Sequence, residues 1–123
     1  MSDAPELTLN HVAIAAPDPE SSMAFYAAFG FQPGFTRRDD TGQITLQQMW
    51  RGAVFVELLA DTDACAPGHF GLHTADIAPL LSHLAPQGIT PLHPPRRGVS
   101  GVLWTFFRDP AGNMVEVTSP WPS

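Results

Sequence analysis

The chain contains no lysine and only one cysteine, Cys65, among its 123 residues. A single cysteine excludes a disulfide within the chain. All six basic residues are arginines, and twelve acidic residues outnumber them to give a net charge of −6. Because phosphate contacts from basic side chains supply most of the affinity for nucleic acids, we do not expect this acidic chain to bind them.

Long apolar runs are also missing from the sequence. No run approaches the roughly 18 residues that a bilayer-spanning helix needs. The first residues, MSDAPELTLN, lack the basic and apolar regions of a signal peptide. We therefore expect a cytoplasmic protein without a membrane partner, and its length fits one domain with a substantial core.

A histidine opens each of two similar segments, NHVAIAAPDPE and GHFGLHTADIA. In both segments an aspartate follows the histidine by seven residues, and a glycine follows it by nineteen. Aspartate is a favoured helix N-cap, and glycine suits the left-handed conformation that ends many helices. The matched residues are His11, Asp18 and Gly30 in the first copy and His69, Asp76 and Gly88 in the second. We interpret the chain as a twofold internal repeat.

Each copy is expected to contain an opening strand, a helix between the aspartate and the glycine, and three further strands. The expected later strands span residues 31–38, 44–50 and 54–59 in the first copy and 89–93, 102–107 and 114–118 in the second. The predicted fold class is therefore α+β, with two βαβββ modules. The modules span residues 8–59 and 68–118 within one domain of residues 7–119, and residues 1–6 and 120–123 are expected to be flexible termini.

The last strand of each copy carries one acidic residue among apolar neighbours, Glu57 in VFVELL and Glu116 in MVEVT. Glu57 follows His11 by 46 residues, and Glu116 follows His69 by 47 residues. An unpaired carboxylate is costly to bury, so each of these is expected to be paired, protonated or bound to a metal. Imidazole and carboxylate ligands together suit Zn, Ni, Co, Mn or Fe(II). The repeat therefore predicts a divalent metal site made of His11, Glu57, His69 and Glu116.

Three segments carry a resemblance to a known family: LNHVAIAAPDPESSMAFYAAFGF, GHFGLHTADI and FFRDPAGNMVEV. From Leu9 to Thr118 the chain resembles the vicinal oxygen chelate superfamily, which includes glyoxalases, extradiol dioxygenases and bleomycin-resistance proteins. The resemblance implies two βαβββ modules that form an open, curved, mixed sheet cupped around a metal. It places the metal ligands on the same four residues. It also implies a homodimer, in which each site lies within one chain or is shared between two.

Three classes of function are compatible with this resemblance. The first is a glyoxalase-like lyase or isomerase that moves a proton next to a metal-chelated carbonyl, with Glu57 or Glu116 as the base. The second is an Fe(II) extradiol-type dioxygenase, which needs two histidines and one glutamate. The third is a metal-free, bleomycin-resistance-like protein that binds a small molecule in an aromatic groove.

Departures from the family's patterns bear on these classes. Ala15 stands where bacterial glyoxalase I has an arginine, and no asparagine follows Glu57 closely. A substrate linked to glutathione is therefore disfavoured. Phe106 stands where the dioxygenases carry a tyrosine, and Glu57 would crowd the oxygen position, so the first class is preferred.

Further residues are candidates for contacts with a small-molecule substrate. His73 shares a strand face with His69 but lies about 13 Å further along, too far to bind the same metal. The segment HPPRRGVSG, residues 93–101, carries two arginines that suit an anionic substrate. Four aromatic residues either line a groove or belong to the core, and core packing is the preferred interpretation. The candidates for substrate contact are His73, Arg96, Arg97, Trp104 and Phe55, and the other two aromatic residues are Trp50 and Phe106.

Overall fold

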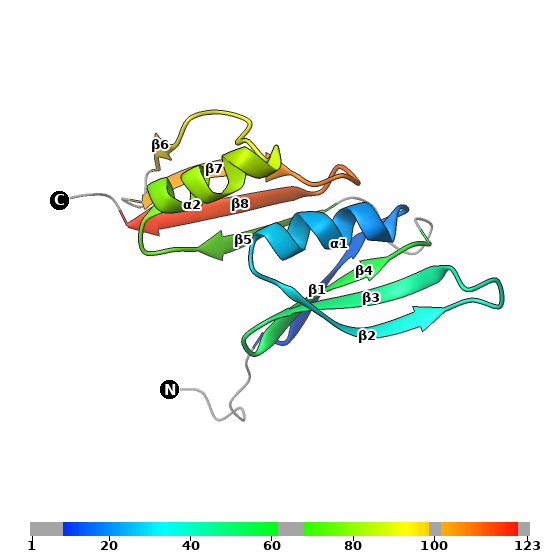
Figure 1. Cartoon of the computed structure of the whole chain (residues 1–123). Helices are drawn as coiled ribbons and strands as arrows, with labels where there is room; N and C mark the ends of the chain where they lie inside the picture. The colour runs from blue at the N-terminus through cyan, green and yellow to red at the C-terminus, as the bar shows by residue number, and fades with distance from the viewer. Residues whose placement is uncertain (1–8, 62–67, 99–101, 121–123) are drawn as a thin grey trace, which may run out of the picture.

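The computed structural model describes residues 9–61, 68–98 and 102–120, and these contain two βαβββ modules (Figure 1). The first module consists of β1 (His11–Ala15), α1 (Pro19–Ala28), β2 (Gln32–Arg38), β3 (Ile44–Arg51) and β4 (Val54–Leu59). The second consists of β5 (His69–His73), α2 (Ile77–Leu84), the short 3-10 helix η1 (Ala85–Gln87), β6 (Arg96–Arg97), β7 (Val102–Arg108) and β8 (Met114–Pro120). The predicted α+β class with a repeated module is confirmed.

Each module forms its own open, mixed sheet within the described residues. The strand order is β1-β4-β3-β2 in the first sheet, here called sheet A, and β5-β8-β7-β6 in the second, sheet B. The opening strand pairs in parallel with the last strand of its module, and the other pairs are antiparallel. The strands that begin with His11 and His69 therefore each occupy a sheet edge.

The helices begin and end where the capping residues predict. Pro19 takes the first turn of α1, and the Asp76 carboxylate accepts a hydrogen bond of 3.2 Å from the Ala78 amide at the start of α2. Gly30 and Gly88 follow the helical segments with φ angles of 88° and 77°, a conformation that other residues rarely adopt. Within the described ranges, no helix is long and apolar enough to cross a membrane.

One predicted strand is wrong. Residues 89–93 do not form a strand, and β6 consists of Arg96 and Arg97 instead. Pro91, Pro94 and Pro95 lack the amide hydrogen that a sheet ladder requires, so regular pairing begins only after them, although the Leu92 amide bonds to the Phe106 carbonyl. The predicted arginine loop of residues 93–101 is therefore partly an edge strand of sheet B, and its residues 99–101 lie outside the described ranges.

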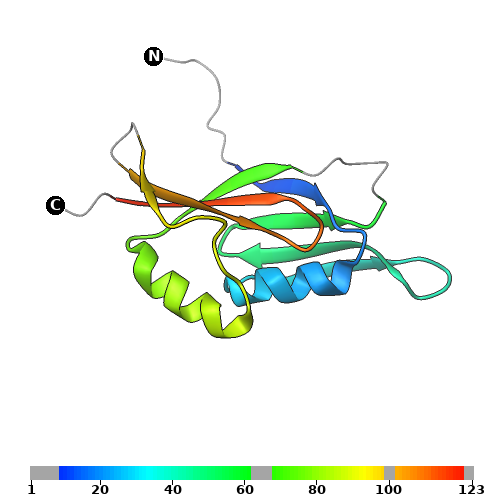
Figure 2. The ribbon, with the colours of Figure 1, turned by 90° about the horizontal axis from the view of Figure 1, so that it is seen from above.

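One hydrophobic core serves both modules, and it lies between the helices and one face of each sheet. Its largest contributors come from α1 and from the two sheets, and Phe29 packs edge-to-face on Phe107 with ring centroids 5.4 Å apart. Figure 2 shows the two helices along one side of the molecule. The His83 imidazole on α2 donates a hydrogen bond of 3.0 Å to the Ala28 carbonyl at the end of α1. The sheet faces turned away from this core are called the open faces below.

The turn between β7 and β8 ties the two modules together. The Asp109 carboxylate accepts hydrogen bonds from the Tyr26 hydroxyl of α1 and from the Asn113 side chain, both at 2.8 Å. Asn113 also donates to the Ala15 carbonyl of β1 at 2.7 Å and accepts from the Gly68 amide, just before β5, at 2.8 Å. Because Asp109 and Asn113 are buried, these bonds satisfy polar groups that would otherwise be costly to bury.

The same backbone turn occurs between β2 and β3, where it is exposed. Asp39 and Gln43 bracket this turn as Asp109 and Asn113 bracket the other, with amide-to-carbonyl distances of 2.9 Å between the bracketing residues in both cases. The Asp39 carboxylate accepts hydrogen bonds from groups of its own turn, namely the Thr41 amide, the Thr41 hydroxyl and the Gln43 amide. The bond to the Thr41 side chain is the main cause that lowers the pKa of Asp39.

Tyr26 is the only tyrosine of the chain, and its hydroxyl is fully buried. Burial, followed by the charge of Asp109 and the hydrogen bond to it, raises the tyrosine pKa far above its ordinary value of 10.0. The folded protein therefore keeps this proton at a pH at which the unfolded chain loses it, so the free energy of unfolding is unaffected below pH 10 and falls above it. We expect tyrosinate absorbance to rise only together with loss of the circular dichroism of the fold. Tyrosinate absorbance in a protein with native circular dichroism would contradict this.

Candidate metal and substrate site

His11 and Glu57 lie on the open face of sheet A. In the parallel β1–β4 pair, His11 is opposite Phe55, and Ala13 is opposite Glu57. Cross-strand partners point to the same side of a sheet, and every second residue shares that side. Glu57 is therefore one row of cross-strand neighbours beyond His11, on the adjacent strand.

Sheet B repeats this arrangement in register. His69 is opposite Met114, and Gly71 is opposite Glu116, so Glu116 is again one row beyond the histidine. A Cβ atom at Gly71 would lie 3.6 Å from the Oε1 atom of Glu116. This is an ordinary contact distance, and the edge-strand neighbour of the glutamate is small in both sheets, Gly71 in sheet B and Ala13 in sheet A.

The His11 ring is held in a defined orientation. Its Nδ1 atom donates to the Oδ1 atom of Asn10 at 2.7 Å, and the ring stacks on Phe55 with centroids 4.6 Å apart and planes 5° apart. The Nε2 atom is therefore the ring nitrogen that could bind a metal, and a hydrogen bond at the other ring nitrogen is the usual support of a metal-binding histidine. The His69 ring packs edge-on to Phe106 at 5.2 Å.

The four predicted ligands form two pairs and not one cluster. Glu57 and Glu116 are half-buried, and both histidines are exposed on the open faces. Among the described residues of one chain, no three His, Cys, Asp or Glu side chains lie close enough together to hold a metal ion. Each pair has the imidazole and carboxylate chemistry of a transition-metal ligand set, but it supplies half of the predicted set.

A row of polar and aromatic side chains crosses the whole of sheet B beyond Glu116. His73 is opposite Thr118, Thr118 is opposite Trp104, and Trp104 is opposite Arg96. These four residues are called the far row. The His73 Nδ1 and Thr118 Oγ1 atoms are 2.8 Å apart, and the Arg96 guanidinium lies 5.9 Å from the centre of the Trp104 ring. Three of the predicted substrate-contact residues thus lie in one row.

A cavity of about 510 Å³ opens over Glu116 and over two members of the far row, Trp104 and Thr118. The described residues that line it are Arg97, Gly98, Val102, Trp104, Phe106, Glu116 and Thr118. Phe55, by contrast, lies on sheet A between His11 and Trp50, whose ring centre is 4.5 Å away. Phe55 therefore belongs to the other half of the predicted site.

The preference for core packing is wrong for three of the four aromatic residues. Trp50, Trp104 and Phe106 are only partly buried and lie on open faces by register. Phe55 is buried, at 7% exposure, but it lies on the open face of sheet A and outside the cluster between helices and sheets. Two residues near them were missed. Thr118 is two positions after Glu116, so strand alternation would have found it. His93 packs on Trp104 at 4.9 Å, and no sequence signal indicates that contact.

The sequence profile of the glyoxalase/bleomycin resistance protein/dioxygenase superfamily matches residues 8–117. The chain belongs to this superfamily. A comparison with curated proteins gives no significant match.

Solved structures share the fold of this chain at low sequence identity. Lactoylglutathione lyase from Agrobacterium tumefaciens is 24% identical, with a TM-score of 0.76 over 94% of this chain and 96% of that one. A superfamily member from Sphaerobacter thermophilus is 22% identical, with a TM-score of 0.73 over 93% and 98% of the two chains. TioX from Micromonospora sp. ML1 is 19% identical, with a TM-score of 0.74 over 91% and 98%.

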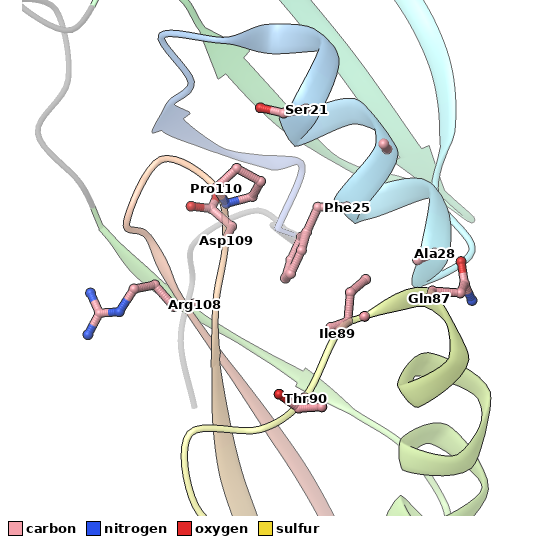
Figure 3. Close-up of a pocket in the computed structure, with 11 residues that line it drawn as sticks. Ser21, Phe25, Ala28, Gln87, Ile89, Thr90, Arg108, Asp109 and Pro110 are labelled. Carbon is pink, nitrogen blue, oxygen red and sulfur yellow. The ribbon is translucent and has the colours of Figure 1, made fainter.

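A second hollow, of about 570 Å³, lies away from the residues that the superfamily resemblance marks (Figure 3). It runs between α1, the segment after η1 and the β7–β8 turn, and Phe25 and Ile89 face each other across it. Of its described lining residues, Arg108 and Asp109 are charged. Arg108 points away, and the Asp109 carboxylate is already bonded to Tyr26 and Asn113. This hollow therefore offers no set of groups for catalysis.

Proposed function

We propose that this chain is a metal-dependent lyase or isomerase of the glyoxalase type, which transfers a proton next to the carbonyl of a small substrate that is not linked to glutathione. The observation that carries the proposal is the matched register of the two histidine–glutamate pairs. A histidine and a glutamate one row beyond it occur on both open faces. Two unrelated surface pairs would not be expected to match in strand, face and row.

The residues that would hold the metal are His11, Glu57, His69 and Glu116. The hydrogen bond from His11 to Asn10 favours a ligand role for that imidazole. A small edge-strand residue stands beside each glutamate, Ala13 beside Glu57 and Gly71 beside Glu116. When bound, a divalent ion (Ni, Zn, Co, Mn or Fe) would supply Lewis-acid polarisation of the substrate carbonyl. Two carboxylates balance the charge of such an ion.

The base is one of the two glutamates. Each is half-buried on an open face. Glu116 lies between Gly71 and Phe106 and so can approach a substrate in a partly dry environment, whereas Glu57 lies between Ala13 and the polar Gln48. A carboxylate there takes the proton from the carbon next to the carbonyl and returns it to the product. The symmetry of the two pairs leaves the choice between Glu57 and Glu116 to experiment.

The complete site forms between two copies of the chain. Since the described residues of one chain bring no three ligands together, the His11–Glu57 pair of one copy faces the His69–Glu116 pair of another. A twofold dimer would contain two such sites. This cytoplasmic homodimer is part of the proposal.

The apolar surroundings of Ala15 support the exclusion of glutathione. Ala15 has 1% exposure, and its cross-strand neighbour Leu59 is followed by Leu46 on β3. No arginine stands at position 15 to bind a glutathione carboxylate, which is the role that the resemblance gives to this position.

Elemental analysis of the purified protein and of the His69→Ala variant tests the proposal. We expect about one divalent ion per chain in the wild type and its loss in the variant, because a missing imidazole leaves an incomplete ligand set. The matched control is His73→Ala, which removes another exposed histidine of β5 and should retain the metal. Absence of metal after soaking with several ions would contradict the proposal.

The alternative functions predict other results. Iron as the retained metal would favour the extradiol-type dioxygenase, although Phe106 lies directly opposite Glu116 and offers no hydroxyl there. A metal-free protein that binds small aromatic molecules is favoured by the cavity next to Trp104 and Phe106. In that case the wild type and the His69→Ala variant would both lack metal and would bind such ligands equally.

A further inference from the structure

The two open faces differ in the row beyond the glutamate. On sheet B this is the far row of His73, Thr118, Trp104 and Arg96. The equivalent row on sheet A consists of Ala15, Leu59, Leu46 and Arg37. Sheet A thus offers an apolar row with one cation at its edge, whereas sheet B combines an indole, a hydroxyl, an imidazole and a guanidinium.

Trp104 is fixed before any ligand arrives. His93 and Phe106 pack edge-to-face with it at centroid distances of 4.9 Å and 5.6 Å. A Cβ atom at Gly98 would lie 3.0 Å from the indole Cδ1 atom, so the glycine permits the close fit. A rigid aromatic wall binds a flat group with little loss of side-chain entropy.

The polar members of the far row favour an anion next to this wall. The Arg96 guanidinium lies over the face of the Trp104 ring. The N–H groups at the edge of the guanidinium remain able to bind a carboxylate. The Thr118 hydroxyl lines the same cavity as Trp104 and Phe106. With the Nδ1–H of His73 donating to it at 2.8 Å, its own proton makes only a long bond of 3.5 Å to the Leu72 carbonyl and can turn to an anion instead. The hydroxyl supplies a second polar group at the level of the ring.

We propose that the far row is a specificity subsite for a planar aromatic group that carries a carboxylate. The ring packs against Trp104 and Phe106, and the carboxylate binds to Arg96 and Thr118. This assignment rests on the proposed function, because it makes the substrate an aromatic acid whose reacting carbonyl lies toward Glu116. The carboxylate of the substrate and the proposed metal ligands then lie on opposite sides of the substrate's aromatic ring.

Binding to the chelator-treated full-length protein tests the subsite without competition from a metal. The probes are cinnamate, the neutral cinnamyl alcohol and the cationic cinnamylammonium, measured by calorimetry. We expect cinnamate to bind about tenfold more tightly than the alcohol, the effect of one charge-assisted hydrogen bond. The preference should disappear in Arg96→Gln and fall in Thr118→Val, whereas Trp104→Leu should weaken the binding of both probes.

Arg37→Gln is the matched control, because Arg37 ends the equivalent row of sheet A, and it should leave the preference unchanged. Equal binding of acid and alcohol, tighter binding of the ammonium probe, or loss of the preference in Arg37→Gln would overturn the subsite. Metal content is measured separately. A preference for cinnamate in a protein that takes up no metal would support the subsite and contradict the proposed reaction. Metal uptake without this preference would support the proposed metal site and contradict the subsite.

Discussion

An equal mixture of the His11→Ala and His69→Ala variants, allowed to exchange subunits, is expected to recover about a quarter of the wild-type metal content. Each variant alone should hold none, because every site in its dimer lacks one histidine. In a mixed dimer with shared sites, both defects meet in one site, and the other site has all four ligands. Random exchange makes half of the dimers mixed, and each regains one of its two sites.

The control for this experiment uses two defects in the same half-site. A mixture of His11→Ala with Glu57→Gln should recover no metal, since each site in the mixed dimer still lacks one ligand from the same pair. Native mass spectrometry would confirm that exchange has occurred in both mixtures. If subunits exchange and no metal returns in the first mixture, the site lies within one chain and the shared arrangement is refuted.

Replacing Asn113 with alanine is expected to lower the free energy of unfolding by about 3 kcal/mol. The change removes hydrogen bonds to the Ala15 carbonyl, the Gly68 amide and the Asp109 carboxylate. The bond to Ala15 joins the two modules, and the other two lie beside it within the second module. Because Asn113 is buried, the freed groups cannot easily regain water. Urea denaturation followed by circular dichroism measures the loss.

Gln43→Ala is the matched control for this variant. Gln43 occupies the same place in the exposed β2–β3 turn as Asn113 does in the buried turn. We expect its replacement to change the free energy of unfolding by less than about 0.5 kcal/mol. Similar losses in the two variants would mean that the turn itself, and not the bonds between modules, sets the stability.

Most of the fold could be predicted because the sequence marks its elements twice. The matched aspartates and glycines located both helices, and the strand 54–59 was predicted to the residue. The strand predicted at residues 89–93 does not form. Its apolar residues suit a strand locally, but the prolines within and after it prevent a regular ladder. Leu92 makes a single amide bond to Phe106 there, and regular pairing waits until Arg96.

The members of each histidine–glutamate pair could be predicted, but the placement of the pairs relative to each other could not. Strand alternation puts a histidine and a glutamate on one face, and the repeat matches the two sets. How the two sheets are oriented depends on Phe29, Phe107 and the rest of the shared core, which the local pattern does not describe. In β7, VLWTFFR, apolar residues occur on both faces, so alternation could not reveal that Trp104 and Phe106 face outward.

The twofold use of one turn indicates where this chain can be extended by protein engineering. New termini or an inserted reporter peptide between Thr41 and Gly42 would interrupt only the exposed turn, whose Asp39 carboxylate bonds are local. The same insertion between Ala111 and Gly112 would separate Asp109 from Asn113 and open the junction that joins both modules. The exposed turn therefore suits circular permutation or fusion. The buried turn does not, because an insertion there would disrupt the junction between the modules.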